Sequence, residues 1–117
     1  MKVMMLAIMK PGDASQPPTK EAILAMHQFN EELEKAGVLL DLGGLMPGVR
    51  VTYKGGKSTV VDGPFAEAKE MVAGYSLLEV KSIEEAIEWA KRSPVQDGQV
   101  EIRPLFDPSM FDPGQGV

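Results

Sequence analysis

The sequence predicts a single α+β domain, a ferredoxin-like βαβ-βαβ sandwich with an inserted β-hairpin. Three observations predict this fold. Two amphipathic segments have helical spacing, apolar segments lie before and after each of them, and a glycine-centred pair of alternating segments lies midway along the chain. The 117 residues suit one core. We expect the domain to span residues 1–106 and a C-terminal tail to span residues 107–117.

The first half of the chain contains the first β-α-β unit. Residues 2–9 are apolar on both alternating faces, which is typical of a central strand covered on both sides. Apolar residues then recur at helical spacing over residues 19–36, and Gly37 lies where a left-handed C-terminal cap is expected. Residues 38–42 are predicted as the second strand. The glycines and the proline of residues 43–48 predict a loop there.

A hairpin and a further strand follow. Residues 49–54 alternate between apolar and polar side chains, and residues 58–61 return after Gly55-Gly56. This pattern is typical of a hairpin with one solvated face. After Asp62-Gly63-Pro64-Phe65, residues 73–80 are predicted as another core strand.

The second helix has a clear start signal. Ser82 can accept a hydrogen bond from the amide of Glu85, and the side chain of Glu85 can reach back to Ser82, which is a capping box. One apolar stripe follows, formed by Ile83, Ala86, Ile87 and Ala90. Pro94 ends the helix, and residues 100–105 are predicted as the last strand.

The predicted fold leaves one face of its sheet uncovered. In a split βαβ arrangement both helices lie on the same face. The first strand is nevertheless apolar on both sides. Since an exposed apolar face is unfavourable in water, we expect a second copy to cover it, so that the protein is a homodimer.

Composition excludes several classes of function. With 17 acidic and 12 basic residues the chain repels a phosphate backbone, so no nucleic-acid partner is expected. It has no cysteine, which excludes a disulfide framework, a thiolate nucleophile and cysteine-bound metal, and which is compatible with the cytoplasm. No apolar run is as long as a membrane span, so we expect no membrane partner. No phosphate loop, dinucleotide fingerprint or nucleophile elbow is present, and we expect neither a cofactor nor a metal.

The segment Val61-Asp62-Gly63-Pro64-Phe65-Ala66-Glu67-Ala68-Lys69-Glu70 resembles the signature of the DGPF branch of YCII-related proteins. Matching context lies at Phe29-Asn30-Glu31-Glu32-Leu33, Ala36-Gly37-Val38, Gly74-Tyr75, Glu84-Glu85-Ala86, Trp89 and Glu101-Ile102-Arg103-Pro104. The resemblance extends to about Leu105. It implies a ferredoxin-like fold that dimerises as dimeric α/β-barrel proteins do, with an activity that is largely unassigned.

The resemblance also bears on possible sites. Some YCII-type relatives are thought to use a His and Asp pair in a cleft, and the DGPF branch is sometimes found beside or fused to sigma-factor regions. Relatives often have His or Gln in the Gly-Leu-X-Pro loop, where this chain has Met46, which cannot exchange protons. This departure argues against a catalytic role for the loop.

The leading candidate for chemistry is Asp62. A carboxylate held at a strand end before a turn can act as a general base or anchor a substrate. The alternative is an Asx-turn that shapes only the backbone. Phe65 could stack on a flat ligand or simply pack into the core. Lys69 and Glu70, with Glu67, could bind an anion and transfer a proton, or form a solvated face.

Two candidates lie elsewhere in the sequence. His27 is the only histidine, and its ordinary pKa suits acid–base chemistry, but its helical angle places it away from the apolar stripe. Arg103 shares a strand face with Glu101 and could bind a carboxylate, or the pair could protect a sheet edge.

Two functions remain open on the sequence. The first is a cofactor-free small-molecule enzyme or binder with a cleft where the Asp62 turn and residues 43–48 meet the sheet edge of the dimer. The second is a non-enzymatic regulatory or protein-interaction module, with a possible link to sigma-factor-dependent transcription.

Overall fold

The computed structural model describes residues 1–10, 18–62, 71–95 and 97–111. The elements, in chain order, are β1 (Lys2–Met9), α2 (Lys20–Lys35), β2 (Leu39–Gly44), β3 (Val49–Lys54), β4 (Lys57–Asp62), β5 (Met71–Glu79), α3 (Ile83–Lys91), β6 (Gln99–Pro104) and the short 3₁₀ helix η1 (Pro108–Phe111).

The main sheet has four strands in the order β2-β5-β1-β6, and every neighbouring pair is antiparallel. The unit β1-α2-β2 therefore straddles β5, and the unit β5-α3-β6 straddles β1. This is the split βαβ order of a ferredoxin-like sheet. The predicted α+β class is confirmed, with β1 at a central position of the sheet.

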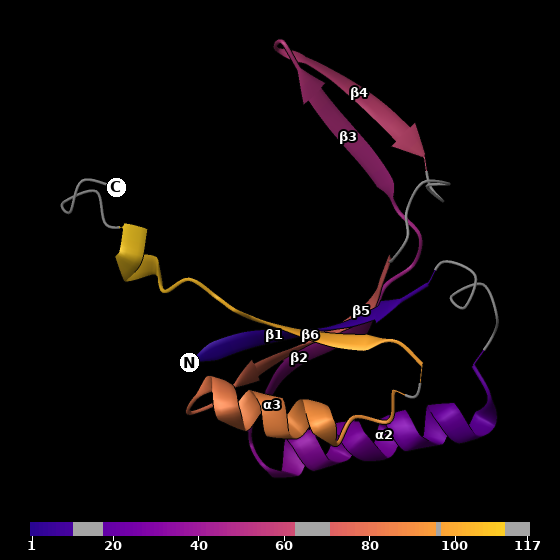
Figure 1. The fold of residues 1–117 in the computed structure, drawn as a ribbon, viewed down its shortest axis with the longest axis vertical. Coiled ribbons are helices and arrows are strands. Elements are labelled where there is room, and N and C mark those ends of the chain that lie inside the picture. The colour runs from indigo at the N-terminus through magenta and orange to yellow at the C-terminus, as the bar shows by residue number, and fades with distance from the viewer. Residues whose placement is uncertain (11–17, 63–70, 96, 112–117) are drawn as a thin grey trace.

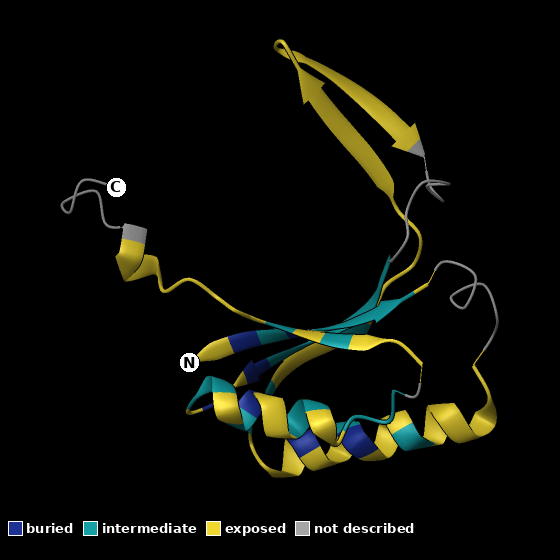
Figure 2. Ribbon diagram, in the orientation of Figure 1, coloured by how far each residue is buried: buried dark blue, intermediate teal, exposed yellow. Residues whose placement is uncertain are grey.

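Both helices lie on one face of the sheet (Figure 1). The core between these layers contains Val3, Met5, Phe29, Leu33, Leu78, Val80 and Ala86, all buried. Figure 2 shows the buried segments where the strands face the helices. On the other side of β1, Met4, Leu6 and Ile8 are only half-buried. We call this second surface the helix-free face.

The two helices also contact each other directly. Phe29 of α2 and Trp89 of α3 meet edge to face, with ring centroids 6.4 Å apart. The Arg92 guanidinium lies 4.4 Å from the Trp89 ring centre and forms an ion pair with Glu32, with an N–O distance of 2.8 Å. The contacts fix the C-terminal half of α2 against α3.

The predicted helix ends are confirmed. The Thr19 hydroxyl accepts a hydrogen bond from the Ala22 amide at 3.1 Å, and Gly37 has the left-handed φ of 74° expected after the C-terminal cap. The Ser82 hydroxyl accepts from the Glu85 amide at 3.3 Å. The reciprocal contact differs from the prediction, because Glu85 Oε1 accepts from the Lys81 amide at 3.0 Å rather than from Ser82.

The prediction of a loop from residue 43 was wrong for its first two residues. Gly43 and Gly44 belong to β2 and pair with Tyr75 and Gly74 of β5. The physical reason is close packing. A Cβ on Gly43 would lie 2.9 Å from the Cε1 atom of Tyr75, and one on Gly74 would lie 3.1 Å from the Gly43 carbonyl oxygen. These glycines therefore permit strand pairing that larger residues would hinder.

Strands β3 and β4 form a separate two-stranded sheet. It projects away from the main sheet on the side opposite the helices (Figure 1). At its turn, Gly55 and Gly56 have φ values of 58° and 79°. Within the described residues, no helix is both long enough and apolar enough to span a membrane.

Candidate functional site

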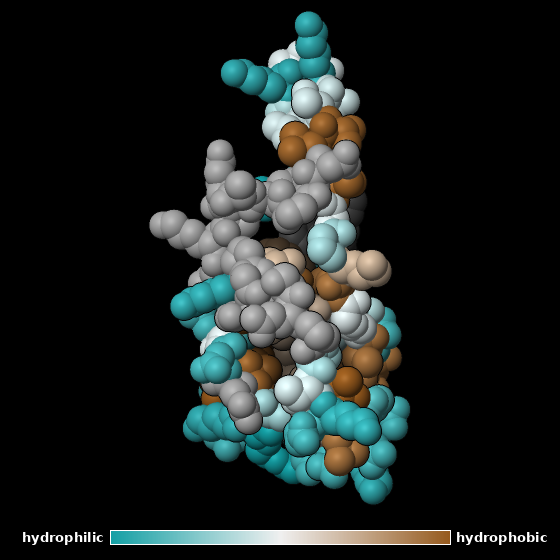
Figure 3. All heavy atoms as spheres, turned by 90° about the vertical axis from the view of Figure 1, so that its right-hand side faces the viewer, coloured by the Kyte–Doolittle hydropathy of each residue, from teal (hydrophilic) through white to brown (hydrophobic). Residues whose placement is uncertain are grey.

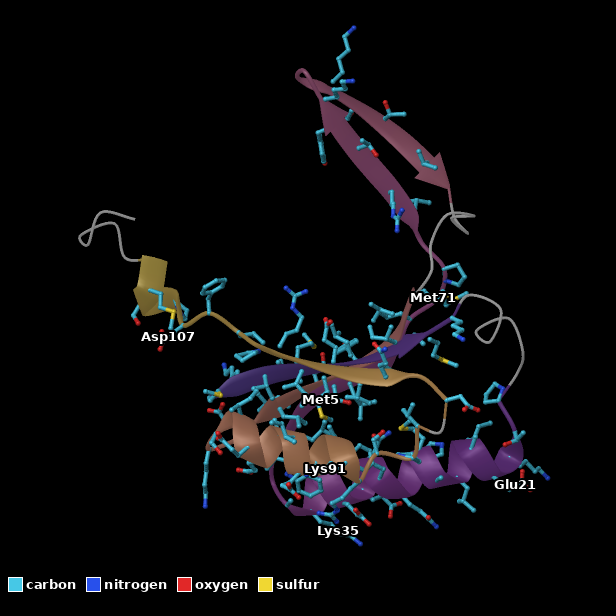
Figure 4. The ribbon with its side chains drawn as sticks, viewed as in Figure 1. Met5, Glu21, Lys35, Met71, Lys91 and Asp107 are labelled. Carbon is cyan, nitrogen blue, oxygen red and sulfur yellow. The ribbon has the colours of Figure 1, made fainter. Side chains whose placement is uncertain are left out.

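An open groove of about 1470 Å³ lies between α2 and the sheet. Met5, Ala7 and Met9 of β1 line one side of it. Ala22, Ala25, Met26, Phe29 and Asn30 of α2 line the opposite side. In Figure 4 the Met5 side chain points from the sheet toward the helix layer, and Glu21 lies at the N-terminal end of α2, where it also lines the groove.

The groove exists because small residues face each other across it. The N-terminal half of α2 contributes Ala22 and Ala25, whereas its C-terminal half contributes the core residues Phe29 and Leu33. On the sheet, Ala7 pairs with Gly74, and both line the groove. Short side chains at these positions leave space that the bulkier residues fill at the other end of the helix.

Ser76 and Asn30 are two of the polar residues that line this largely apolar groove. Ser76 pairs with the core residue Met5, so its hydroxyl lies on the helix side of the sheet. Asn30 faces the groove from α2. Both are half-buried, and neither side chain forms a hydrogen bond among the described residues. An amide and a hydroxyl offer both donors and acceptors to a ligand.

Charged groups lie at the edge of the groove. Lys10, Glu21 and Asp97 line it and are exposed. They provide both signs of charge around an apolar interior, so a ligand with an apolar body and a charged or polar end would fit this distribution. The described residues contain no group of three or more His, Asp or Glu placed to hold a metal ion.

A second polar arrangement lies at the edge of the sheet. The Tyr75 hydroxyl donates a hydrogen bond to Asp41 Oδ2 at 3.0 Å, and Asp41 Oδ1 accepts from the Leu42 amide at 2.9 Å. The hydrogen bond to Asp41, followed by partial desolvation and the negative charge of Asp41, raises the pKa of the Tyr75 hydroxyl above its ordinary value. Tyr75 pairs with Leu6, which places this pair on the helix-free face.

Most of the residues proposed from the DGPF segment lie outside the described residues. This holds for Phe65, Lys69 and Glu70, and for the side chain of Asp62. The main chain of Asp62 is the end of β4, where it pairs with Val49. The roles suggested for these four residues therefore stay predictions.

The structure separates the other two candidates from the groove. His27 is exposed on α2 and does not line the groove. Arg103 is exposed on the helix-free face, where it pairs with Met4 and its Nε lies 4.0 Å from Glu101 Oε2. The contact with Glu101 agrees with the predicted sharing of a strand face. No described contact brings either candidate together with Asn30 or Ser76.

Sequence reasoning did not single out the polar residues that the structure places at these two sites. Asn30 and Tyr75 belong only to the family context, and Ser76 and Asp41 have no local motif that marks them. The available signal was the pair of alanines at 22 and 25, which leave the apolar stripe of the helix narrow at its N-terminal half. Strand register, which brings Tyr75 beside Asp41, has no such signal.

Comparison with known proteins supplies two matches. A family model described as the YCII-related domain matches residues 1–109. A protein of Rhizobium meliloti (strain 1021), described as uncharacterised, is 32% identical over 87 residues, which cover 69% of this chain and 68% of that protein.

Proposed function

Since this chain belongs to the YCII-related family, whose members share this domain, we propose a function from its own groove. We propose that it binds a small organic molecule in the groove between α2 and the sheet. Within the family we assign it to the DGPF branch, on the residues 61–70. If the protein also converts the bound molecule, we propose that it does so without a cofactor.

The observation that supports this proposal is the groove with two half-buried polar groups that lack partners among the described residues. Ligand pockets typically have volumes of roughly 300–1,000 Å³, with a few polar groups in an apolar lining. The groove is about 1470 Å³ and therefore has room for a ligand together with water. A buried amide or hydroxyl is favourable only when it forms hydrogen bonds, and a ligand would provide them for Asn30 and Ser76.

The chemistry of the lining suggests the class of ligand. Met5, Met26 and Phe29 offer polarisable and aromatic surface, which suits a flat or aromatic body. Asn30 and Ser76 suit a phenol, a carbonyl or a carboxylate at its end. Asp62 is proposed as the proton acceptor. Its support is the sequence alone, because β4 ends at Asp62 and projects from the main sheet on the side opposite the helices (Figure 1).

The proposal can be tested by thermal shift against a library of phenols, carbonyl acids and other small anions. A ligand that binds only the folded state raises the melting temperature by mass action. We expect a hit that Asn30→Leu and Ser76→Val both weaken. The matched control is Gln28→Leu, which is exposed on the same helix and does not line the groove.

The outcomes separate the possible roles. If Asn30→Leu and Ser76→Val bind the hit as the wild type does, the groove is not the binding site. Loss of turnover in Asp62→Asn with binding retained would identify an enzyme, whereas unchanged turnover would exclude Asp62 as the base. No hit across the library would favour the regulatory protein-interaction module.

We further propose that the protein acts as a homodimer of the dimeric α/β-barrel type, joined through the helix-free face, and that it acts in the cytoplasm. The dimer is supported by half-buried Met4, Leu6 and Ile8, with Leu77 in register with Met4. Sedimentation equilibrium tests it. Leu6→Glu should give monomers, and Leu24→Glu, at an exposed position of α2, should leave the dimer intact. A monomeric wild type would exclude the dimer.

A further inference from the structure

The β3–β4 hairpin, residues 49–62, has two chemically different faces; we call it the arm. Val51 pairs with Val60 and Tyr53 pairs with Ser58, so these side chains share one face with Val49. The opposite face contains Arg50, Thr52, Lys54, Lys57, Thr59 and Val61. We call the first set the apolar face of the arm.

The apolar face is largely exposed to solvent. Its side chains are exposed by 62% for Val49, 45% for Val51, 78% for Tyr53 and 63% for Val60. Figure 3 shows hydrophobic side chains on the hairpin below its hydrophilic tip. Alternation of this kind ordinarily places the apolar face against another surface. Here the expected buried face is open to solvent.

Among the described elements, the arm has no extensive contact with the main sheet. The strands β3 and β4 make their contacts chiefly with each other. The radius of gyration is 17.1 Å, whereas a compact chain of this length has about 13 Å. An isolated two-stranded hairpin is marginally stable in water, so contact with a further surface would stabilise this geometry.

The distribution of charge along the chain suggests that this further surface belongs to a second copy. The arm, residues 49–62, contains three of the 12 basic residues, Arg50, Lys54 and Lys57, and one acidic residue, Asp62. The rest of the chain therefore has nine basic against 16 acidic residues. Two arms repel each other, whereas an arm is attracted to the acidic body of a second copy.

The same chain has a second uncovered apolar surface, through which the proposed dimer joins, and the arm would extend that interface. The helix-free face presents Met4, Leu6 and Ile8, and its border contains charged residues of both signs, Glu79 and Glu101 together with Lys2 and Arg103. The arm rises on this side of the sheet, opposite the helices (Figure 1). Both uncovered apolar surfaces of one chain thus lie on the same side, which suits a reciprocal two-fold contact.

We propose that the arm is an exchanged clasp, whose apolar face lies on the helix-free side of a second copy. The proposal depends on the proposed dimer and is independent of ligand binding in the groove. Each protomer would contribute one arm, so every arm substitution acts twice in the dimer.

Photo-crosslinking tests the clasp directly. Tyr53→p-benzoylphenylalanine retains an aromatic side chain at the most exposed position of the apolar face. On irradiation we expect a covalent dimer whose cross-linked peptide maps to β1, β5 or β6 of the other chain. The control is Leu24→p-benzoylphenylalanine, on α2 at the other side of the molecule, and we expect no covalent dimer from it.

Sedimentation measures the strength of the contact. We expect Tyr53→Ser to raise the dimer dissociation constant by about tenfold or more, because buried aromatic residues dominate interface energies. Thr52→Ser, on the opposite face of the arm, should change it less than about twofold. A wild-type dimer that Tyr53→Ser does not weaken, or whose cross-links map within one chain, would overturn the clasp and retain the sheet-face dimer. A wild type that stays monomeric would overturn both, and the ligand screen would be unaffected.

Discussion

Replacement of Leu33 by alanine tests how the structure holds the wall of the groove in place. Leu33 is fully buried, at 0% exposure, and packs in the core beside Phe29, Leu78 and Val3. It lies on α2, the helix that forms one side of the groove. The core among the described residues comprises only seven buried side chains, so a cavity at this position has few neighbours that could close it.

The expected loss follows from the burial. A Leu→Ala change at a fully buried position costs about 2–5 kcal/mol, from lost transfer energy and from the cavity that remains. Domains of this size are stable by about 5–15 kcal/mol. We therefore expect Leu33→Ala to lower the free energy of unfolding by about 3 kcal/mol, which is a large fraction of the total.

Urea unfolding followed by tryptophan fluorescence is a suitable assay. Trp89 is the single tryptophan and packs against the core, so its emission reports on the contact between the helices. Leu24→Ala is the matched control, because Leu24 lies on the same helix and is 60% exposed. It should cost less than about 1 kcal/mol. Both variants are compared at one protein concentration, since dimerisation would add concentration-dependent stability.

Equal losses for Leu33→Ala and Leu24→Ala would refute the assignment of the buried face of α2. A loss at Leu33 below about 1 kcal/mol would do the same. A large loss at Leu24 alone would show that the helix packs through its other face.

Three further predictions concern the sheet edge and the second helix. Gly43→Ala should displace the Tyr75 ring and lower the melting temperature. Gly44→Ala should not, because its Cβ meets nothing within 4 Å. Equal effects of the two substitutions would contradict the close packing of Gly43 against Tyr75. Asp41→Ala should lower the pKa of Tyr75, read by ultraviolet titration, and an unchanged pKa would exclude the hydrogen bond as its cause. The pKa of Tyr75 is raised in the folded state, so the hydrogen bond from Tyr75 to Asp41 contributes fully to stability below about pH 10. This contribution is lost as the pH rises through the folded-state pKa of Tyr75. Ser82→Ala should lower the free energy of unfolding, measured with urea, by about 1 kcal/mol, and Ser82→Asp should retain the wild-type value because aspartate also caps a helix. A loss of stability in Ser82→Asp as large as in Ser82→Ala would exclude the capping role.

Local sequence signals determined the helices and the approximate extents of the strands. The caps at Thr19 and Ser82 and the glycine at 37 act within a few residues of the helix ends that they stabilise. The structure has Ser82 and Gly37 in the predicted roles, and Thr19, predicted as the first helical residue, is the N-terminal cap. The alternation of residues 49–54 and the apolar pattern of residues 2–9 likewise reflect side-chain directions that repeat along one strand. Such signals can be recognised in the sequence because the interacting residues are neighbours in the chain.

Only the tertiary structure decided which surfaces become sites. Gly43 and Gly44 join a strand because Tyr75 and Gly74 pair with them, and Tyr75 meets Asp41 across 34 positions of sequence. The groove exists because alanines of α2 face Ala7 and Gly74, and the apolar face of the arm is open because the arm leaves its own sheet. Each of these depends on strand register and on the distance between layers. Both are set by packing of the whole chain, so the sequence of any one segment does not contain them.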